Sequence, residues 1–207
     1  MELMLIRHAL PVRRELDAGV ADPELSAAGL AQAQHLAEYL AREPIDALYS
    51  SPMRRAYQTA EPLAADKGLD IEVVDAVAEW DRDSNEYVPI EELKAAGDPR
   101  WKAMMAGELD MGDETPDSFS HRVVTALEAI IDANPGRRVA VTCHGGVVNA
   151  YLSHILGLPV NPGFFYPNYT SIHRIAASRG GHRSVVTINE TAHLRGTGLP
   201  MGVVQQS

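Results

Sequence analysis

The chain has 207 residues, of which 45% are hydrophobic and 22% are charged, a composition typical of globular proteins. This length suits one domain, residues 1–207, with a sizeable core and an inserted flap. The formal net charge of −10 argues against partners such as nucleic acid or an acidic membrane surface, although it leaves room for a small cationic pocket.

The cysteine count and the apolar runs bear on the compartment. Cys143 is the one cysteine of the sequence, so no internal disulfide is possible, which fits a reducing cytoplasm. No stretch approaches the roughly 20 apolar residues of a membrane span, and the N-terminus lacks the apolar length of a signal peptide. We therefore expect a cytoplasmic protein with neither a membrane nor a nucleic acid as partner.

The first half of the chain alternates apolar runs with helix signals. We expect a strand over 2–7, a helix over 25–43, a strand over 45–50, a helix over 51–68 and a strand over 71–74. Ser26 and Ser51 are the expected N-caps of the two helices. In the first helix, Leu30, Leu36 and Leu40 are expected on the inward face. Residues 12–24 are polar and are expected to form a loop.

The second half continues the alternation after an irregular segment. We expect a helix over 115–134 capped by Thr115, a strand over 137–143, a helix over 145–157, and an antiparallel pair of strands over 171–177 and 182–190. Strands separated by helices imply a mostly parallel sheet with helices on both faces. The expected fold is therefore a three-layer α/β/α sandwich.

Polar residues follow three of the expected strands at the point where each strand ends. Arg7 and His8 end the first strand, Arg54 and Arg55 lie on the turn after the second, and His144 directly follows the strand at 137–143. In such sheets, ligands bind beyond the carboxyl ends of the strands. Two histidines and one or two arginines at one edge favour a phosphate ligand, because guanidinium binds phosphate bidentately and keeps its charge.

These residues also suggest a reaction. A neutral imidazole can attack phosphorus, and transfer to a histidine would divide a very slow hydrolysis into two easier steps. The second histidine, when protonated, would stabilise the negative oxygens. A carboxylic acid is then needed to protonate the leaving alkoxide. Glu79 is the best-placed candidate, and Asp81 and Asp83 are rivals.

The irregular segment, residues 80–117, has a strongly acidic composition. It is expected to hold one or two short helices and to act as a lid over the site. It carries eleven acidic residues (Asp81, Asp83, Glu86, Glu91, Glu92, Asp98, Glu108, Asp110, Asp113, Glu114, Asp117) against four basic ones (Arg82, Lys94, Arg100, Lys102). An acidic lid makes a highly charged polyphosphate an unfavourable substrate.

Several motifs resemble the histidine phosphatase superfamily, the phosphoglycerate-mutase-like group. The strongest are LIRHA (5–9), SSPMRRAYQTA (50–60) and VTCHGGVV (141–148), in the order that the family has them. The resemblance implies that His8 is the phosphorylated nucleophile, in a reaction that uses no metal and no cofactor. It further implies that Arg7, Arg55 and His144 form the phosphate pocket and that Glu79 is the proton donor.

The sequence departs from the family pattern after the first motif. Ala9-Leu10-Pro11 replaces the usual Gly and Glu or Gln, and Arg14 stands where many members place Asn. Arg14 is either a substrate-binding residue or a solvated loop charge. The aromatic stretch at 163–169 is likewise either the interface of a homodimer or a packed loop.

The functional hypothesis is a metal-independent phosphatase that hydrolyses small phosphomonoesters through a phosphohistidine. A phosphoglycerate-type mutase is the alternative within the family, and a non-catalytic phosphate-binding module on the same fold is the alternative outside catalysis. A metal hydrolase with His8 and His144 as ligands is a further alternative, but two histidines without a nearby carboxylate make a poor zinc site.

Overall fold

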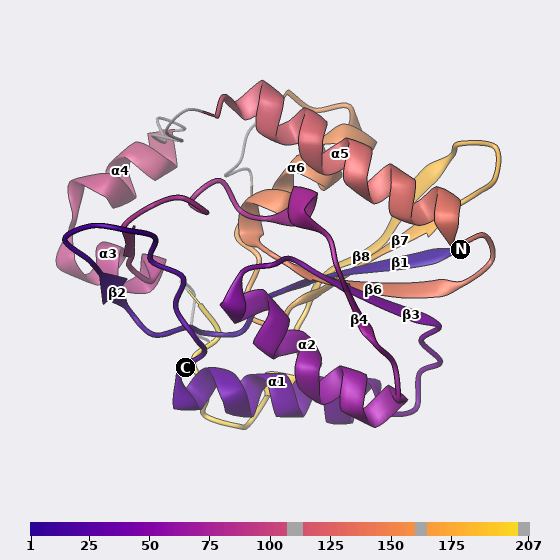
Figure 1. The fold of residues 1–207 in the computed structure, drawn as a ribbon, viewed down its shortest axis with the longest axis horizontal. Coiled ribbons are helices and arrows are strands. Elements are labelled where there is room, and N and C mark those ends of the chain that lie inside the picture. The colour runs from indigo at the N-terminus through magenta and orange to yellow at the C-terminus, as the bar shows by residue number, and fades with distance from the viewer. Residues whose placement is uncertain (107–113, 160–164, 203–207) are drawn as a thin grey trace.

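The computed structural model describes residues 1–106, 114–159 and 165–202. The strands of the main sheet are β1 (Glu2–Arg7), β3 (Ala47–Ser50), β4 (Ile71–Val73), β6 (Arg138–Cys143), β7 (Ile172–Ala177) and β8 (Arg183–Glu190). They form a six-stranded sheet in the order β4-β3-β6-β1-β7-β8 (Figure 1). The first four in this order run parallel, whereas β7 is antiparallel to β1 and β8 is antiparallel to β7. The expected mostly parallel sheet is confirmed.

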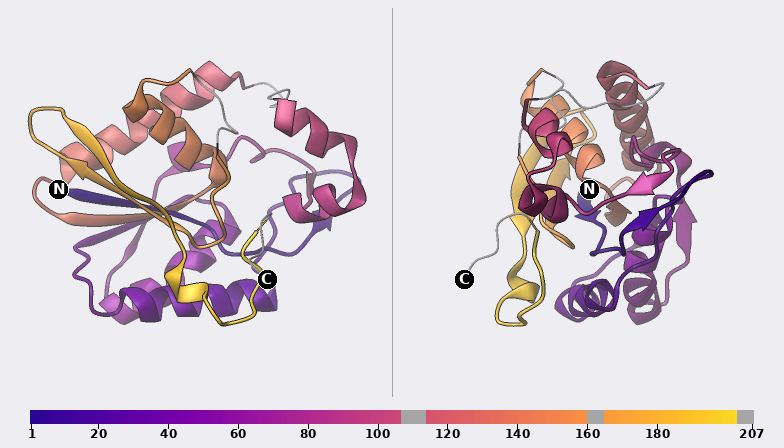
Figure 2. Two further views of the ribbon diagram at one scale, coloured as in Figure 1. Left: turned by 180° about the vertical axis from the view of Figure 1, so that it is seen from behind. Right: turned by 90° about the vertical axis from the view of Figure 1, so that its left-hand side faces the viewer.

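Helices cover both faces of this sheet (Figures 1 and 2). One layer consists of α1 (Ala27–Leu40) and α2 (Arg54–Lys67), and the other of α5 (Pro116–Ala133) and α6 (Gly145–Leu156). Along β1, Leu3 and Leu5 pack into the core beneath α5 and α6, whereas Met4 and Ile6 pack toward α1 and α2. This alternation is the period of two that a strand imposes, and it buries both faces as a three-layer fold requires.

The helix signals were partly right. Ser26 and Thr115 cap α1 and α5 as expected, each accepting a hydrogen bond from a backbone N–H in the first turn. The expected cap at Ser51 is wrong, because α2 begins at Arg54 and Met53 occupies the N-cap position. The expectation for Leu30 is also wrong, since this side chain is 53% exposed. It lies about 240° around the helix from Leu36, away from the buried face.

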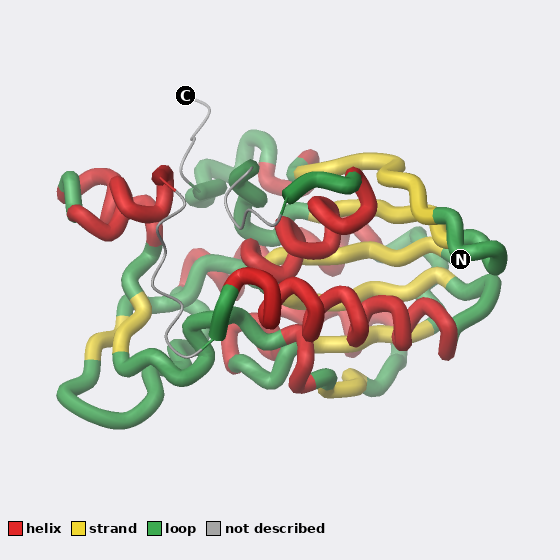
Figure 3. Tube along the Cα trace, turned by 90° about the horizontal axis from the view of Figure 1, so that it is seen from above, coloured by secondary structure: helices red, strands yellow, loops and turns green. Residues whose placement is uncertain are grey.

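The segment that we expected to form a lid lies beyond the carboxyl ends of the central strands (Figures 1 and 3). Its described part contains β5 (Glu86–Tyr87), α3 (Ile90–Ala96) and α4 (Pro99–Ala106). Residues 107–113, which include three of its acidic residues, lie outside the described part of the chain. We refer to residues 80–106 together with 114–117 as the insertion.

A short strand joins the insertion to the N-terminal part of the chain. β2 (Arg14–Glu15) pairs antiparallel with β5, within a stretch that we expected to be entirely loop. Two residues are too few to show the alternation that marks a strand in a sequence. Two short 3₁₀ helices, η1 (Asp75–Val77) and η2 (Ala192–Leu194), complete the described elements. None of the described helices combines the length and apolar character needed to cross a membrane.

Candidate active site

Three adjacent strands deliver polar side chains to one edge of the sheet. In the register of β1 and β6, Arg7 lies beside Cys143, so His8 and His144 leave neighbouring strands together. β3 lies on the other side of β6 and leads through Ser51 into α2, whose first turn carries Arg55. The side chains that the sequence predicted to meet are thus brought together, and all of them are buried.

The His8 imidazole is held in one orientation. Its Nδ1 lies 2.8 Å from the carbonyl oxygen of Ala9, which can only accept a hydrogen bond, so Nδ1 carries the proton and Nε2 keeps a lone pair. Burial and the positive charges of Arg55 and Arg7 hold the pKa of His8 well below its usual range. The ring is therefore neutral at physiological pH, with one nitrogen able to act as a nucleophile.

Arg7 is surrounded by aromatic rings rather than by carboxylates. Its guanidinium carbon lies 4.3 Å from the ring centre of Tyr169 and 4.9 Å from that of Tyr166, both within cation–π range. Its Nη1 donates to the carbonyl oxygen of Pro167 at 2.6 Å. Its buried Nε has no hydrogen-bond partner among the described residues, and an oxyanion could accept from it.

Arg55 is a second buried cation with donors to spare, and its side chain is only 1% exposed. Its Nη2 donates to Asp81 Oδ1 at 2.7 Å, and its guanidinium lies 4.7 Å from the ring centre of Tyr87. Within the described part of the chain, neither its Nε nor its Nη1 has a hydrogen-bond partner. Because unpaired buried N–H groups are costly, these donors indicate a place for an anion.

His144 lies next to His8, with the two ring centres 5.2 Å apart. Its Nε2 is 2.8 Å from Ser51 Oγ, while the buried Nδ1 finds no partner among the described residues. Burial, followed by the charge of Arg55, holds the pKa of His144 well below its usual range. His144 is also the N-cap of α6, so the positive end of that helix dipole points toward the same edge.

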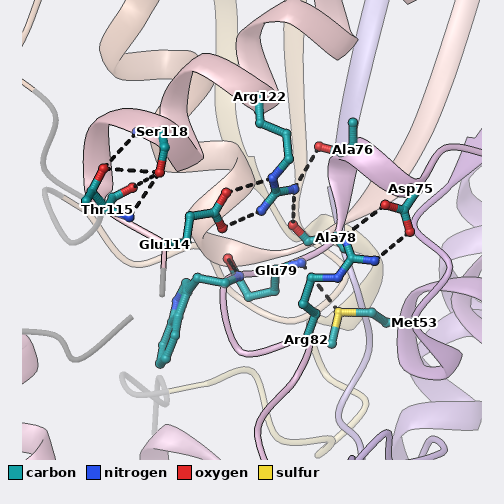
Figure 4. Close-up of polar contacts among 11 residues, drawn as sticks. Met53, Asp75, Ala76, Ala78, Glu79, Arg82, Glu114, Thr115, Ser118 and Arg122 are labelled. Carbon is teal, nitrogen blue, oxygen red and sulfur yellow. Dashed lines mark hydrogen bonds and ion pairs between the residues drawn. The ribbon is translucent and has the colours of Figure 1, made fainter. Parts of the chain in front are cut away.

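Glu79 is the buried carboxyl of the site. Its Oε2 accepts from the backbone N–H of Gly146 at 2.8 Å, and its Oε1 accepts from the N–H of Trp80 at 3.2 Å. Its own N–H donates to Met53 Sδ at 3.4 Å (Figure 4). Burial and the nearby charge of Asp81 raise the pKa of Glu79 to about 7, so that a large fraction of it is protonated near neutrality.

The rivals of Glu79 lie in different surroundings. Asp81 is ion-paired with Arg55, and Asp83 is exposed. Arg14 lies apart from these groups, since its guanidinium pairs with Glu24 at 2.7 Å and it is not among the described residues that line the cavity.

Three tyrosines were missed as residues of this site. Tyr87 comes from the insertion, and no spacing in the sequence connects it with Arg55. Tyr166 and Tyr169 belong to the stretch that we considered as an interface or a packed loop. Tyr169 is fully buried, which fits a packed loop for the described part, while Gly163 and Phe164 lie outside it. The sequence offers no signal for tyrosines that pack against Arg7 or Arg55, beyond the presence of aromatic residues elsewhere in the chain.

Most of these groups face one cavity of about 1420 Å³, whereas the fully buried His144 and Tyr169 are not among the described residues that line it. Arg7, His8, Arg55 and Glu79 line it, and the insertion and residues 165–167 supply much of the remaining wall. The described residues contain no group of three or more His, Cys, Asp or Glu placed to hold a metal ion. The cavity is much larger than a phosphate group, so it has room for the remainder of an ester.

Comparison with known proteins places the chain among phosphate-handling proteins. The family model described as histidine phosphatase superfamily, branch 1, matches residues 3–191. Phosphoserine phosphatase 1 of Hydrogenobacter thermophilus is 29% identical over 201 residues, which is 94% of each chain. Phosphoglycerate mutase-like protein 4 of Arabidopsis thaliana is 33% identical over 164 residues, covering 72% of this chain and 68% of that protein.

Solved structures share the fold. A mutant phosphoserine phosphatase from Entamoeba histolytica, in complex with phosphoserine, superposes with a TM-score of 0.71 at 25% identity, covering 93% of this chain and 98% of that one. A mycobacterial glucosyl-3-phosphoglycerate phosphatase with inorganic phosphate gives the same TM-score, identity and coverage. The chain is therefore similar, over nearly its whole length, to proteins that act on phosphate esters.

Proposed function

This chain belongs to the histidine phosphatase superfamily, and from that premise we propose that it hydrolyses small phosphomonoesters through a phosphohistidine formed on His8, without a metal ion. Its similarity to phosphoserine phosphatases supports phosphatase activity in general terms. The finer assignment of mechanism and residues is our proposal, and it rests on the geometry of the site.

The observation that carries the proposal is the state of His8. Its Nδ1–H is held by the Ala9 carbonyl, its ring is neutral, and it lies beside two arginines that have unpaired donors. A histidine that served only to fill the core would not need two buried cations next to it. A phosphate dianion placed there would be bound by Arg7 and Arg55 and attacked by His8 Nε2.

The first step transfers the phosphoryl group. His8 Nε2 forms the N–P bond while the bond from phosphorus to the ester oxygen breaks, and the protonated Glu79 gives its proton to the departing alkoxide. In the second step, Glu79, now a carboxylate, takes a proton from water as the water oxygen attacks phosphorus. The N–P bond breaks, and phosphate and neutral His8 are regenerated.

The remaining groups stabilise charge on the transferring oxygens. Arg7 and Arg55 supply fixed donors in a buried site, where electrostatic interactions are stronger than in water. A bound phosphate dianion would raise the pKa of His144 by placing an opposite charge next to it, and protonated His144 would then be a further donor. We propose that the insertion closes over this arrangement as a lid.

A mutase is the second candidate, favoured by the similarity to a protein named for phosphoglycerate mutase. A mutase must retain a doubly phosphorylated intermediate, for which extra cations would be needed around the cavity. The arginines Arg82, Arg100 and Arg122, which line the cavity, are already ion-paired with carboxylates. This pairing favours the phosphatase.

The test is the hydrolysis of an aryl phosphate near pH 6, with excess chelator present, by the wild type and by His8→Ala and Glu79→Ala. We expect activity that survives the chelator, is lost in His8→Ala and falls strongly in Glu79→Ala. Quenching in alkaline detergent after exposure to ³²P-labelled substrate should trap base-stable, acid-labile label on the wild type but not on His8→Ala. Activity that needed a metal ion, or that persisted in His8→Ala, would contradict the proposal.

A further inference from the structure

Beyond the phosphate pocket, the cavity wall carries arginines whose charges are already neutralised. Arg122 is the clearest case, because both oxygens of Glu114 accept from it, at 2.9 and 2.7 Å (Figure 4). Its third nitrogen, Nη1, donates to the carbonyl oxygens of Ala76 and Ala78, both at 3.0 Å. All three nitrogens of this guanidinium therefore have partners.

The two other arginines of the wall are also paired with a carboxylate through two nitrogens each. Arg82 donates to both oxygens of Asp75, at 2.9 and 2.6 Å (Figure 4). Arg100 donates to both oxygens of Asp98 and also to Glu86. A substrate carboxylate or second phosphate that bound one of these arginines would have to share it with a carboxylate that is already bidentate, or displace that carboxylate. The displaced group would then repel the incoming anion at short range.

Arg7 differs from them. It faces tyrosine rings, and among the described residues no carboxylate forms an ion pair with it. Arg55 does have a carboxylate partner, Asp81, but it keeps two unpaired nitrogens. The unpaired guanidinium nitrogens of Arg7 and Arg55 thus lie beside His8, where one phosphate group would bind.

The rest of the described wall is largely apolar. The side chains that lie on it include Trp80, Ile90, Leu93, Trp101, Met104 and Phe165. Four of these, Ile90, Leu93, Trp101 and Met104, come from α3 and α4, which places them on the insertion rather than on the sheet. Aromatic and methionine side chains give a broad, adaptable apolar surface of the kind that binds uncharged ligand groups.

We propose that this cavity selects phosphomonoesters whose alcohol is apolar, aliphatic or aromatic, and carries no second anionic group. The inference rests on the proposed function and names its substrate class. A neutral apolar alcohol would bury its surface against the insertion while its phosphate took the free donors at Arg7 and Arg55. An ester whose alcohol carries a carboxylate, such as phosphoserine or 3-phosphoglycerate, would place that carboxylate where the described arginines of the wall are already ion-paired.

The experiment compares kcat/KM for 2-phenylethyl phosphate and for phosphoserine, both esters of primary alcohols. We expect the wild type to prefer 2-phenylethyl phosphate by at least about tenfold, with the difference mainly in KM. An equal or higher kcat/KM for phosphoserine or 3-phosphoglycerate would overturn the inference and leave the proposed phosphatase intact. If none of these esters, nor ethyl phosphate, is hydrolysed, the proposed function itself fails and the inference falls with it.

Trp101→Ala tests the apolar wall directly. Ethyl phosphate is the reference substrate for this variant and for its control. Trp101→Ala should lower the ratio of kcat/KM for 2-phenylethyl phosphate to that for ethyl phosphate by about fivefold or more. Leu30→Ala, at an exposed leucine of α1 outside the cavity, is the matched control and should leave this ratio unchanged. A Trp101→Ala ratio equal to that of the control would contradict an apolar subsite.

Glu114→Gln tests the part played by the paired arginines. The change removes the negative charge that neutralises Arg122 while keeping the shape of the side chain. We expect the ratio of kcat/KM for phosphoserine to that for ethyl phosphate to rise by more than about twofold, because Arg122 becomes available to a carboxylate. An unchanged ratio would show that the ion pairs of the wall do not determine the substrate class.

Discussion

His8 and Glu79 are two buried ionisable residues whose pKa values move in opposite directions. Burial disfavours the charged form of each, so the pKa of the imidazole falls and the pKa of the carboxyl rises to about 7. The result near neutrality is a neutral nucleophile and a carboxyl that still holds its proton. These are the protonation states that the first step of the proposed reaction requires.

Gly146 permits the position of the Glu79 carboxyl. A Cβ atom at Gly146 would overlap Glu79 Oε1, and the nearest atom that could give way is that carboxylate itself. We expect Gly146→Ala to lower kcat by about tenfold or more, since the acid would be displaced from the ester oxygen. The measurement is steady-state hydrolysis of an alkyl phosphate, whose poor leaving group depends on protonation.

Gly145→Ala is the matched control for this prediction. The same helix turn receives the same methyl group, but the nearest atoms are 3.8 and 3.9 Å away, an ordinary contact distance. Its kcat should fall much less than that of Gly146→Ala. Equal losses in the two variants would mean that the effect does not depend on the contact between Gly146 and Glu79.

At the scale of elements, α1 and α2 hold the loop that follows His8. The N–H of Leu10 donates to Gln32 of α1 at 2.8 Å, and the carbonyl of Leu10 accepts from the N–H of Ser26, the cap of that helix, at 3.0 Å. The N–H of Ala9 donates to Thr59 of α2 at 2.9 Å. The orientation of the proposed nucleophile therefore depends on helices that are far from it in sequence.

Gly29 tests this contact between helix and loop. A Cβ at Gly29 would overlap the carbonyl oxygen of Leu10, which is backbone and cannot rotate away. We expect Gly29→Ala to destabilise the protein by about 1–3 kcal/mol, although alanine is the better helix former by roughly 1 kcal/mol. It should also lower kcat, because the loop beside His8 must shift.

Urea denaturation, with activity measured in parallel, checks the Gly29→Ala prediction. The neighbouring exposed residue gives the control, since Leu30→Ala should change the free energy of unfolding by less than about 0.5 kcal/mol. A stabilised Gly29→Ala protein with normal kcat would refute the close approach.

At the scale of the whole molecule, burying Glu79 makes folding stability depend on pH. In the unfolded chain this carboxyl loses its proton near its ordinary pKa of about 4.3, whereas in the folded protein it keeps the proton up to about pH 7. Between these values the folded state binds more protons than the unfolded state. The contribution of Glu79 to stability therefore falls as the pH rises through this window and stays unfavourable above it.

Glu79→Gln should remove this dependence. We expect the free energy of unfolding of the variant, relative to the wild type, to increase by on the order of 2 kcal/mol between about pH 5 and pH 8. Urea denaturation of both proteins at the two pH values measures it. Glu72→Gln, at an exposed position on β4, controls for loss of a carboxyl. A difference between Glu79→Gln and the wild type that did not change with pH would contradict a raised pKa at Glu79.

The sequence by itself determined the order along the chain of the main-sheet strands and of the helices that cover that sheet, the edge of the sheet where Arg7, His8, Arg55 and His144 meet, and the family. The helices and strands could be predicted because hydrophobic periodicity and most capping residues act over a few neighbouring positions. The shared edge could be predicted because parallel strands that are joined by helices end at the same edge of the sheet. The errors at Ser51 and Leu30 are errors within one turn of a helix, where packing outweighs local preference.

Only the tertiary structure decided which partner each charged or aromatic side chain has. Examples are the contacts of Asp81 with Arg55, of the tyrosines with Arg7, and of Glu114 with Arg122. In each case one partner lies in an irregular segment, whose sequence shows no hydrophobic periodicity from which its course could be predicted. The same holds for Glu79, which is distinguished from Asp81 and Asp83 by its contact with Gly146, 67 residues away in the chain. Ion pairs and burial depend on distances in space between residues remote in sequence, and the path of the insertion sets those distances.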